Sequence, residues 1–268
     1  MAKKARHWYV YGFMWTADIE NAEVSTICAG VKTNYVRHGD LAAITSSIRG
    51  QDFDPDNANN RLGNEEWLKN VVLAHEGVAE AHMQLGPIVP CRFGIIFASP
   101  DALVEYMAEN HDRLRDLLQN VTGCKEWGVK VFVSRPAARE RALARSTELK
   151  PLRDKIAITP GGTRYLLERR LASQLETIVD NEIDTAANAI IPALSAKAVA
   201  FQVGPVNGPV GTDADQDKEL VANVSFLVSD GAFADFRETF AALAGNCGEN
   251  GIDLRLTGPW PPYHFASE

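Results

Sequence analysis

The strongest constraint on the fold is a long amphipathic pattern between residues 162 and 191. Apolar side chains recur there every three or four positions, at Leu167, Leu171, Leu175, Ile178, Val179, Ile183, Ala186 and Ile190. A spacing near 3.5 residues predicts a helix with a narrow apolar seam that packs against another helix. We expect that partner helix to lie in the same chain, with a subunit contact in a dimer as the alternative.

The region after this helix has a regular order of further elements. Three β-rich runs and one helical run follow it, at residues 198–203, 220–228, 232–244 and 252–257. In the second run Val224, Phe226 and Val228 alternate onto one face, as in a half-buried strand. The order α-β-β-α-β predicts a ferredoxin-like α+β domain.

The first half of the chain alternates β-rich and helical runs. Strands are predicted at residues 7–14, 32–36 and 41–48, with a hairpin loop at 37–40 in which Gly39 supplies the turn. The run 51–63 is rich in Asp, Asn and Pro and predicts a loop, which ends at a capping residue, Asn64.

Two helices and two strands complete this half. A helix over residues 64–85 buries one broad stripe: Trp67, Leu68, Val71, Val72, Ala74, Val78, Ala79 and Met83. A strand is predicted at 88–97, with Gly94 indicating an edge, a bulge or a close backbone approach. A helix capped by Ser99 and Pro100 runs to about Gly123, and a strand covers 126–133.

The break Ser134-Arg135-Pro136 marks the predicted domain boundary. We therefore predict an N-terminal mixed α+β sheet domain over residues 1–135. A C-terminal helical segment with the ferredoxin-like domain is predicted over residues 136–268. The length of 268 residues favours two packed cores rather than one.

Charge and apolar patterning argue against nucleic-acid and membrane functions. The net charge is −8, which would repel a phosphate backbone. Residues 135–170 nevertheless hold ten Lys or Arg against four Asp or Glu, so this stretch carries +6 and the remainder −14. It forms either a solvated helical face or a docking surface for an acidic partner. The apolar stretch 8–15 is too short to span a membrane.

No residue pattern predicts catalysis, a cofactor or a metal. Cys28, Cys91, Cys124 and Cys247 form no C-x-x-C pair, which favours reduced thiols in a cytoplasmic protein. His75 and His82 lie two turns apart, but the zinc-protease pattern needs a histidine at position 79, which is alanine. These histidines, with His111, are expected to be ordinary interhelical or surface residues.

Five uncommon strings resemble a known family in identity and order. They are Tyr-Val-Tyr-Gly at 9–12, Val-Leu-Ala-His-Glu at 72–76, Pro-Ile-Val-Pro-Cys-Arg-Phe-Gly at 87–94, Glu-Trp-Gly-Val-Lys-Val at 126–131, and Thr-Gly-Pro-Trp-Pro-Pro-Tyr at 257–263. Together they resemble the GvpL/GvpF family of gas vesicle proteins across both halves of the chain. The sequence departs from the family pattern at Cys91, where an aliphatic residue is expected, and at 264–266, where a more apolar ending is expected.

This resemblance implies a minor or accessory component of gas vesicle formation, located in the cytoplasm or on the vesicle. It implies contacts with the small hydrophobic shell protein and with other gas vesicle proteins, and it implies no enzyme activity. We expect the partner-binding residues to be Arg92, Phe93, Ile95, Trp260, Pro261, Pro262 and Tyr263. Rigid prolines and large aromatic residues bury area at a low entropic cost.

Two alternatives remain for these residues and for the whole chain. Trp260 and Tyr263 could instead fix the C-terminus, and Arg92 could serve an ion pair within the chain. The protein could also be a small-ligand-binding regulatory module, since ferredoxin-like sheets often hold metabolites. An enzyme would be indicated by a cleft that holds titratable groups with strongly shifted pKa values.

Overall fold

The computed structural model describes residues 6–19, 26–27, 30–49, 65–206, 217–249 and 251–267. Cys28, the predicted loop 51–63 and the predicted cap Asn64 lie outside these residues. The chain forms two compact units, one of residues 1–126 with 259–268 and the other of residues 127–258. Each unit combines helices with a β-sheet, so the predicted α+β class is confirmed.

The first unit is built on an antiparallel sheet with β1 at its centre. Its strands are β1 (Arg6–Trp15), β2 (Asn34–His38), β3 (Leu41–Arg49), β4 (Ile88–Pro90) and β5 (Ile96–Phe97). They lie in the order β2-β3-β1-β4, and β5 also pairs with β1. A short 3-10 helix, η1 (Thr16–Asp18), follows β1, and Gly39 makes the β2–β3 turn with φ +59°, as predicted.

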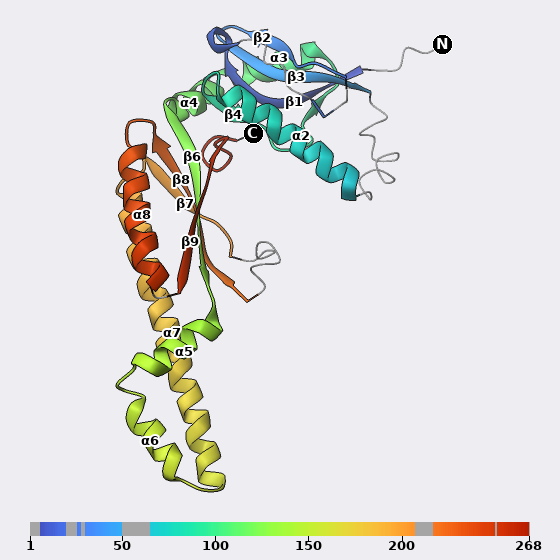
Figure 1. Cartoon of the computed structure of the whole chain (residues 1–268). Helices are drawn as coiled ribbons and strands as arrows, with labels where there is room; N and C mark the ends of the chain where they lie inside the picture. The colour runs from blue at the N-terminus through green and yellow to red at the C-terminus, as the bar shows by residue number, and fades with distance from the viewer. Residues whose placement is uncertain are drawn as a thin grey trace. The chain divides into compact units, whose positions relative to one another are not determined.

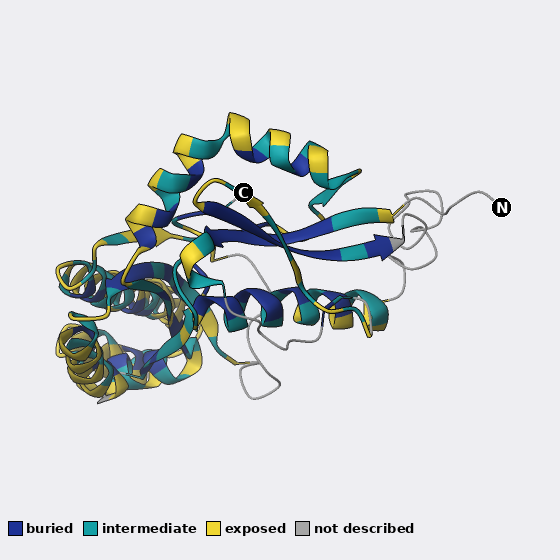
Figure 2. Ribbon diagram, turned by 90° about the horizontal axis from the view of Figure 1, so that it is seen from above, coloured by how far each residue is buried: buried dark blue, intermediate teal, exposed yellow. Residues whose placement is uncertain are grey.

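Helices cover both faces of this sheet (Figures 1 and 2). Helix α2 (Glu65–Met83) packs on one face, where Val78 and Ala79 contact the core around Tyr9. Helices α3 (Pro100–Glu109) and α4 (His111–Val121) lie on the other, where Phe13 stacks on Tyr106 with ring centroids 6.0 Å apart. Because both faces are covered, β1 is buried along most of its length.

A β-bulge in β1 sets which side chains face which helix. The pairing of β1 with β3 shifts register between Val10 and Gly12. Tyr9, Tyr11 and Met14 consequently share the core under α2, although strict alternation would place Met14 on the other face. The bulge thus aims two tyrosines at α2.

Substitution of Gly12 by alanine is expected to destabilise the first unit by about 2 kcal/mol. A Cβ at Gly12 would lie 2.7 Å from the carbonyl oxygen of Val89, a backbone atom that cannot move without disturbing β4. Gly77→Ala is the matched control. Nothing lies within 4 Å of its Cβ, so in helix α2 it should stabilise by about 0.5–1 kcal/mol. Urea denaturation of both variants measures the difference, and equal effects would contradict the steric argument.

Two predicted elements of this unit are interrupted. The predicted strand 88–97 consists of β4 and β5, which are separated at Gly94, where φ is +98°. The predicted helix after Ser99 is the pair α3 and α4, broken at Asn110, whose side-chain amide donates to the carbonyl oxygen of Tyr106 at 2.9 Å. The predicted Ser99 cap is confirmed, because its Oγ accepts from the backbone N–H of Ala102 at 3.1 Å.

The second unit contains a four-stranded sheet in the order β7-β8-β6-β9. The strands are β6 (Cys124–Val133), β7 (Ala200–Val203), β8 (Glu219–Ser229) and β9 (Ile252–Trp260). The sequence pattern placed the β6 region at the end of the first domain, whereas the structure pairs β6 with β8 and β9. With β6 included, the chain order is β6, then three helices (residues 135–195), then β7, β8, one helix (residues 233–249) and β9. The ferredoxin-like assignment stays a prediction.

The helices of this unit are α5 (Arg135–Arg145), α6 (Lys150–Ile158), α7 (Gly162–Ser195) and α8 (Phe233–Glu249). The predicted face of β8 is confirmed, because Val224, Phe226 and Val228 are buried in one core with Leu175 and Val179 of α7. The long helix packs against α5, α6 and α8 of the same chain, as expected. Helix α6 and the first half of α7 extend beyond the sheet as a helical hairpin (Figure 1).

Candidate functional site

The seven residues expected to bind partners all lie in the first unit, on two segments. Arg92, Phe93 and Ile95 belong to the β4–β5 segment (residues 91–95), which joins the two short strands. The other four residues, Trp260 to Tyr263, belong to the C-terminal segment (residues 259–267), which the contacts assign to the same unit as residues 1–126. We predicted a single domain boundary between residues 135 and 136, so the assignment of the C-terminal segment to the first unit was not predicted.

The seven side chains differ in exposure. Arg92 and Trp260 are exposed, with 41% of Trp260 accessible to solvent. Phe93, Ile95 and Tyr263 are half-buried, and Pro261 and Pro262 are buried. Two of the seven side chains are thus accessible to solvent, and the other five are at least half-buried.

A buried hydrogen-bond chain fixes the β4–β5 segment. The Tyr9 hydroxyl accepts from the Gly94 N–H at 3.1 Å and lies 2.9 Å from His75 Nδ1. His75 Nε2 lies 3.0 Å from the carbonyl oxygen of Cys91. A carbonyl only accepts, so we assign the ring proton to Nε2, and Tyr9 then donates to Nδ1. His75 is therefore neutral and clamps the start of the segment to helix α2.

Aromatic packing adds to this clamp. The ring of Phe93 lies 6.1 Å from that of Tyr9 and 5.9 Å from that of His75, both in edge-to-face geometry. Such pairs stabilise beyond their buried area by about 0.5–1.5 kcal/mol. Phe93 thus anchors the segment, which leaves the neighbouring Arg92 in solvent.

The C-terminal segment is held at two places. Glu126 is only 3% exposed, and its carboxylate accepts from the His264 backbone N–H at 3.0 Å and contacts His264 Nδ1 at 2.5 Å. The Tyr263 hydroxyl lies beside Glu76 of α2. Burial raises the pKa of Tyr263, and the adjacent Glu76 carboxylate raises it further. Burial also raises the pKa of Glu76, and the adjacent Tyr263 hydroxyl, which is buried without a hydrogen-bond partner of normal geometry among the described residues, offsets part of this rise.

These contacts account for both departures from the family pattern. Cys91 is fully buried, so its thiol fills the space of an aliphatic side chain while its backbone carbonyl binds His75. His264 gives the buried carboxylate of Glu126 a partner that an apolar residue could not provide. Cys91 thus helps to fix the β4–β5 segment, and His264 helps to fix the C-terminal segment.

His75 and Glu126 were not predicted as anchors of these segments. His75 lies four residues after Val71 and three before Val78, so it continues the buried stripe of α2, and this spacing was the available signal. No pattern in the neighbouring sequence indicates the role of Glu126, because its partner, His264, lies 138 positions away.

The cluster of shifted groups is arranged for structure rather than catalysis. Burial raises the pKa of the Tyr9 phenol and lowers the pKa of the His75 imidazole. Both side chains are fully buried, and their polar atoms bind protein groups, so neither can reach a substrate. Across the described ranges, no three His, Cys, Asp or Glu residues are grouped so that they could hold a metal ion.

The second unit has a groove of about 760 Å³ beside the middle of α7. Ala142 of α5, Ile183, Ala186 and Ile190 of α7 and Leu243 of α8 contribute apolar side chains to its wall. Its charged lining residues, which include Arg145 and Glu182, are exposed. The groove therefore offers an apolar wall with polar groups at its rim.

None of the helices in the described ranges has a stretch long and apolar enough to cross a membrane.

The chain matches the family model described as "Gas vesicle synthesis protein GvpL/GvpF" over residues 7–267. It is 29% identical to gas vesicle protein L of Streptomyces sp. (strain CB03234), covering 96% of this chain and 92% of that protein. It is 25% identical to gas vesicle protein L2 of Halobacterium salinarum, covering 97% and 91%.

Two solved structures share this fold. The crystal structure of GvpF from Anabaena sp. PCC7120 matches with a TM-score of 0.71 and 16% identity, over 97% of this chain and 98% of that one. GvpF from Microcystis aeruginosa matches with a TM-score of 0.66 and 17% identity, over the same shares. Both matches include residues of both units.

Proposed function

Because the chain belongs to the GvpL/GvpF family of gas vesicle proteins, we propose that it serves vesicle formation by binding the small hydrophobic shell protein. Other gas vesicle proteins are the further partners in this proposal. The family match over residues 7–267 carries the gas vesicle role. The anchored segments that present Arg92 and Trp260 support the binding role.

The presentation of Trp260 is the observation that favours direct contact with a partner. The indole is 41% exposed, although the residues that follow it are buried or anchored. A large aromatic side chain on a fixed backbone binds without a large loss of conformational entropy. Tryptophan and arginine are also the residue types that most often dominate binding energy at protein interfaces.

A binding role also fits the physical problem of assembly. A shell protein with an exposed apolar surface associates with other copies of itself unless a partner covers that surface. A protein that covers it needs a fixed apolar contact and no catalytic group. The exposed indole beside buried prolines provides such a contact in this proposal.

We expect Trp260→Ala to weaken capture of the shell protein by about 10-fold or more, because truncation of an interface tryptophan commonly costs at least about 2 kcal/mol. The tagged protein is purified from cells that express the shell protein, and intact vesicles are separated by flotation. Leu73→Ala is the matched control, because Leu73 is 58% exposed on α2 and is not among the proposed contact residues. Arg92→Ala should weaken capture in the same direction.

Thermal melts of the same variants separate binding from anchoring. Normal capture by a less stable Trp260→Ala protein would show that the tryptophan fixes the C-terminus and would refute the contact.

Shell protein captured in the soluble fraction would support an assembly role, and protein retained on floated vesicles would support a structural one. Absence of this protein from both would refute shell-protein binding.

The groove beside α7 is the observation that favours a second candidate, a small-ligand-binding module. Its volume of about 760 Å³ is within the range of ligand pockets. A metabolite that co-purifies with the protein, and is lost on Ala186→Trp, would support this candidate. A ligand-free protein that still captures the shell protein would refute it.

A further inference from the structure

The helical arm, which we define as α6 and residues 162–175 of α7, carries a surface that the proposed function does not use. Helices α6 and α7 pack against each other, and Ile156 of α6 is buried. Residues 157–170 are nearly all exposed.

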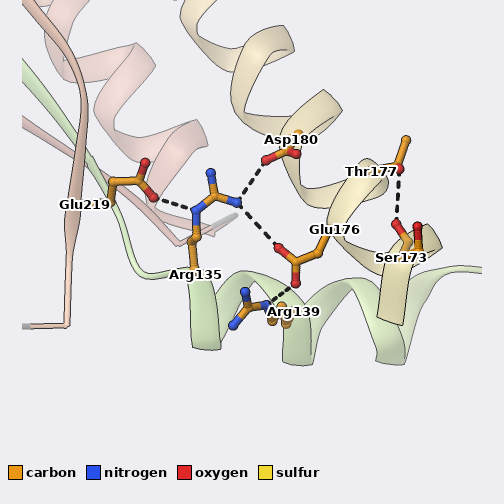
Figure 3. Close-up of polar contacts among 7 residues, drawn as sticks. All are labelled: Arg135, Arg139, Ser173, Glu176, Thr177, Asp180 and Glu219. Carbon is orange, nitrogen blue, oxygen red and sulfur yellow. Dashed lines mark hydrogen bonds and ion pairs between the residues drawn. The ribbon is translucent and has the colours of Figure 1, made fainter. Parts of the chain in front are cut away.

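The positive charges near the base of the arm are neutralised within the protein. Arg135 contacts Glu219 at 2.5 Å, Asp180 at 2.8 Å and Glu176 at 3.6 Å (Figure 3). Arg139 contacts Glu176 at 2.5 Å. These pairs tie α5 to α7 and β8, so the charges at the base have an internal structural use.

Arg153 of α6 donates to the carbonyl oxygen of Leu143 in α5 at 2.7 Å, but the other positive charges of the arm have no such use. Among the described residues, Lys150, Lys155, Arg169 and Arg170 form no ion pair, and the pair Arg164–Glu168 joins neighbours on one helix at 2.9 Å. Residues 150–170 hold six Lys or Arg against two Asp or Glu, a balance of +4, in a chain whose net charge is −8. The arm therefore presents a local field opposite in sign to that of the whole protein.

Exposed apolar side chains lie among these charges. Tyr165 is 60% exposed, Leu166 is 64% exposed and Ile158 is 83% exposed. On α7, Arg169 is one turn after Tyr165, and Arg170 is one turn after Leu166, so the four side chains share a helical face. This face lies opposite the seam that contains Leu171 and Leu175, which packs into the protein.

We propose that this basic and apolar face of the arm is a docking surface for an acidic amphipathic helix of a partner protein. The apolar face of that helix would cover Tyr165 and Leu166, and its flanking carboxylates would pair with Arg169 and Arg170. Arginine forms bidentate pairs with carboxylates, which favours an acidic partner. Tyr165 is the only aromatic residue of the stretch, so the face lacks the stacking platforms of a nucleic-acid site.

The test measures binding of a fluorescent 18-residue helical peptide, with leucines at three- and four-residue spacing and glutamates elsewhere, by anisotropy. Arg169→Glu/Arg170→Glu should weaken binding to the full-length protein by about 10-fold or more, as for loss of two charged pairs. Leu166→Ala should weaken it less. Lys69→Glu/Arg237→Glu is the matched control, because it makes the same charge change at exposed positions outside the arm.

Other outcomes would overturn the proposal. Equal binding of a peptide with lysines in place of the glutamates would refute charge recognition, and equal weakening by the control variant would refute the location. Binding to vesicles with 30% phosphatidylserine, without peptide binding, would assign the arm to a lipid surface. A wild-type dimer that the double reversal dissociates, as measured by sedimentation, would assign it to a second copy of the chain.

Discussion

Acidification from pH 7 to pH 5 is expected to destabilise the first unit strongly, because two imidazoles are buried there in the neutral form. Burial lowers the pKa of His75 and of His82. Tyr35 and the carbonyl oxygen of Val78 bind the ring nitrogens of His82 at 2.9 and 2.7 Å, much as Tyr9 and Cys91 bind those of His75. Protonation would place a second ring hydrogen opposite a tyrosine hydroxyl and a charge in the core.

The direction of the effect follows from proton binding in the two states. An unfolded histidine titrates near pH 6.5, whereas the folded pKa of each of these residues is lower, so the unfolded chain binds more protons below pH 6.5. The contribution of these two histidines to the stability is therefore fully present above pH 6.5, and it decreases as the pH falls from 6.5 towards the folded pKa. Each imidazole can remove up to about 1.4 kcal/mol per pH unit in that window. Glu76 acts in the opposite direction, because its folded pKa is raised.

His75→Leu is the variant that tests this explanation. At pH 7 it should cost about 2–4 kcal/mol, because the carbonyl oxygen of Cys91 loses its donor and Tyr9 loses an acceptor inside the core. Between pH 6.5 and 5 it should lose less further stability than the wild type. Urea titrations, read by hydrogen exchange in α2, measure both effects.

Leu73→Ala is the matched control for the acid effect. Leu73 is 58% exposed on α2 and carries no titratable group, so its truncation should leave the pH dependence of the first unit unchanged. Glu76→Gln should make the acid transition steeper, because the opposing titration is removed. An equal pH dependence in wild type and His75→Leu would refute the buried-histidine explanation.

Local patterns predicted the elements that depend on neighbouring residues. The apolar seam of α7, the Gly39 hairpin and the Ser99 cap each need information from only a few adjacent positions, and the structure confirms all three. The irregularity at Gly94 was predicted as an edge, a bulge or a close backbone approach, but the break at Asn110 was missed, because apolar residues continue on both sides of it. The periodicity of apolar side chains does not show where a single residue interrupts a helix or a strand.

Long-range pairing was the part that the sequence pattern could not supply. β6 follows the first unit in the chain but pairs with strands more than 85 positions later, and residues 259–267 return to the first unit. The expected binding residues illustrate the same limit. Their composition suggested a rigid aromatic surface, whereas the structure separates exposed Trp260 and Arg92 from buried Pro261 and Pro262. That separation depends on Glu126 and His75, which are distant in the sequence.

Reversal of one charge at the base of the arm should have a large effect on the second unit. Arg135 is the shared partner of Asp180, Glu176 and Glu219, and the hydrogen bonds that it donates to Glu219 and Asp180 raise its pKa (Figure 3). Arg135→Glu would place a fourth carboxylate among these three. At low ionic strength we expect a loss on the order of 3 kcal/mol, allowing for the partial exposure of every member of the cluster.

The dependence on salt separates this mechanism from simple loss of packing. In 1 M salt the Debye length falls to about 3 Å, so much of the repulsion should be screened and the loss of stability should shrink. Arg135→Met removes the ion pairs, keeps most of the aliphatic packing and adds no charge, so its effect should be smaller than that of the reversal. Chemical denaturation in urea, which is uncharged, allows the salt concentration to be varied independently. A loss that is the same at low and high salt would show that Arg135 acts through its aliphatic stem rather than through its charge.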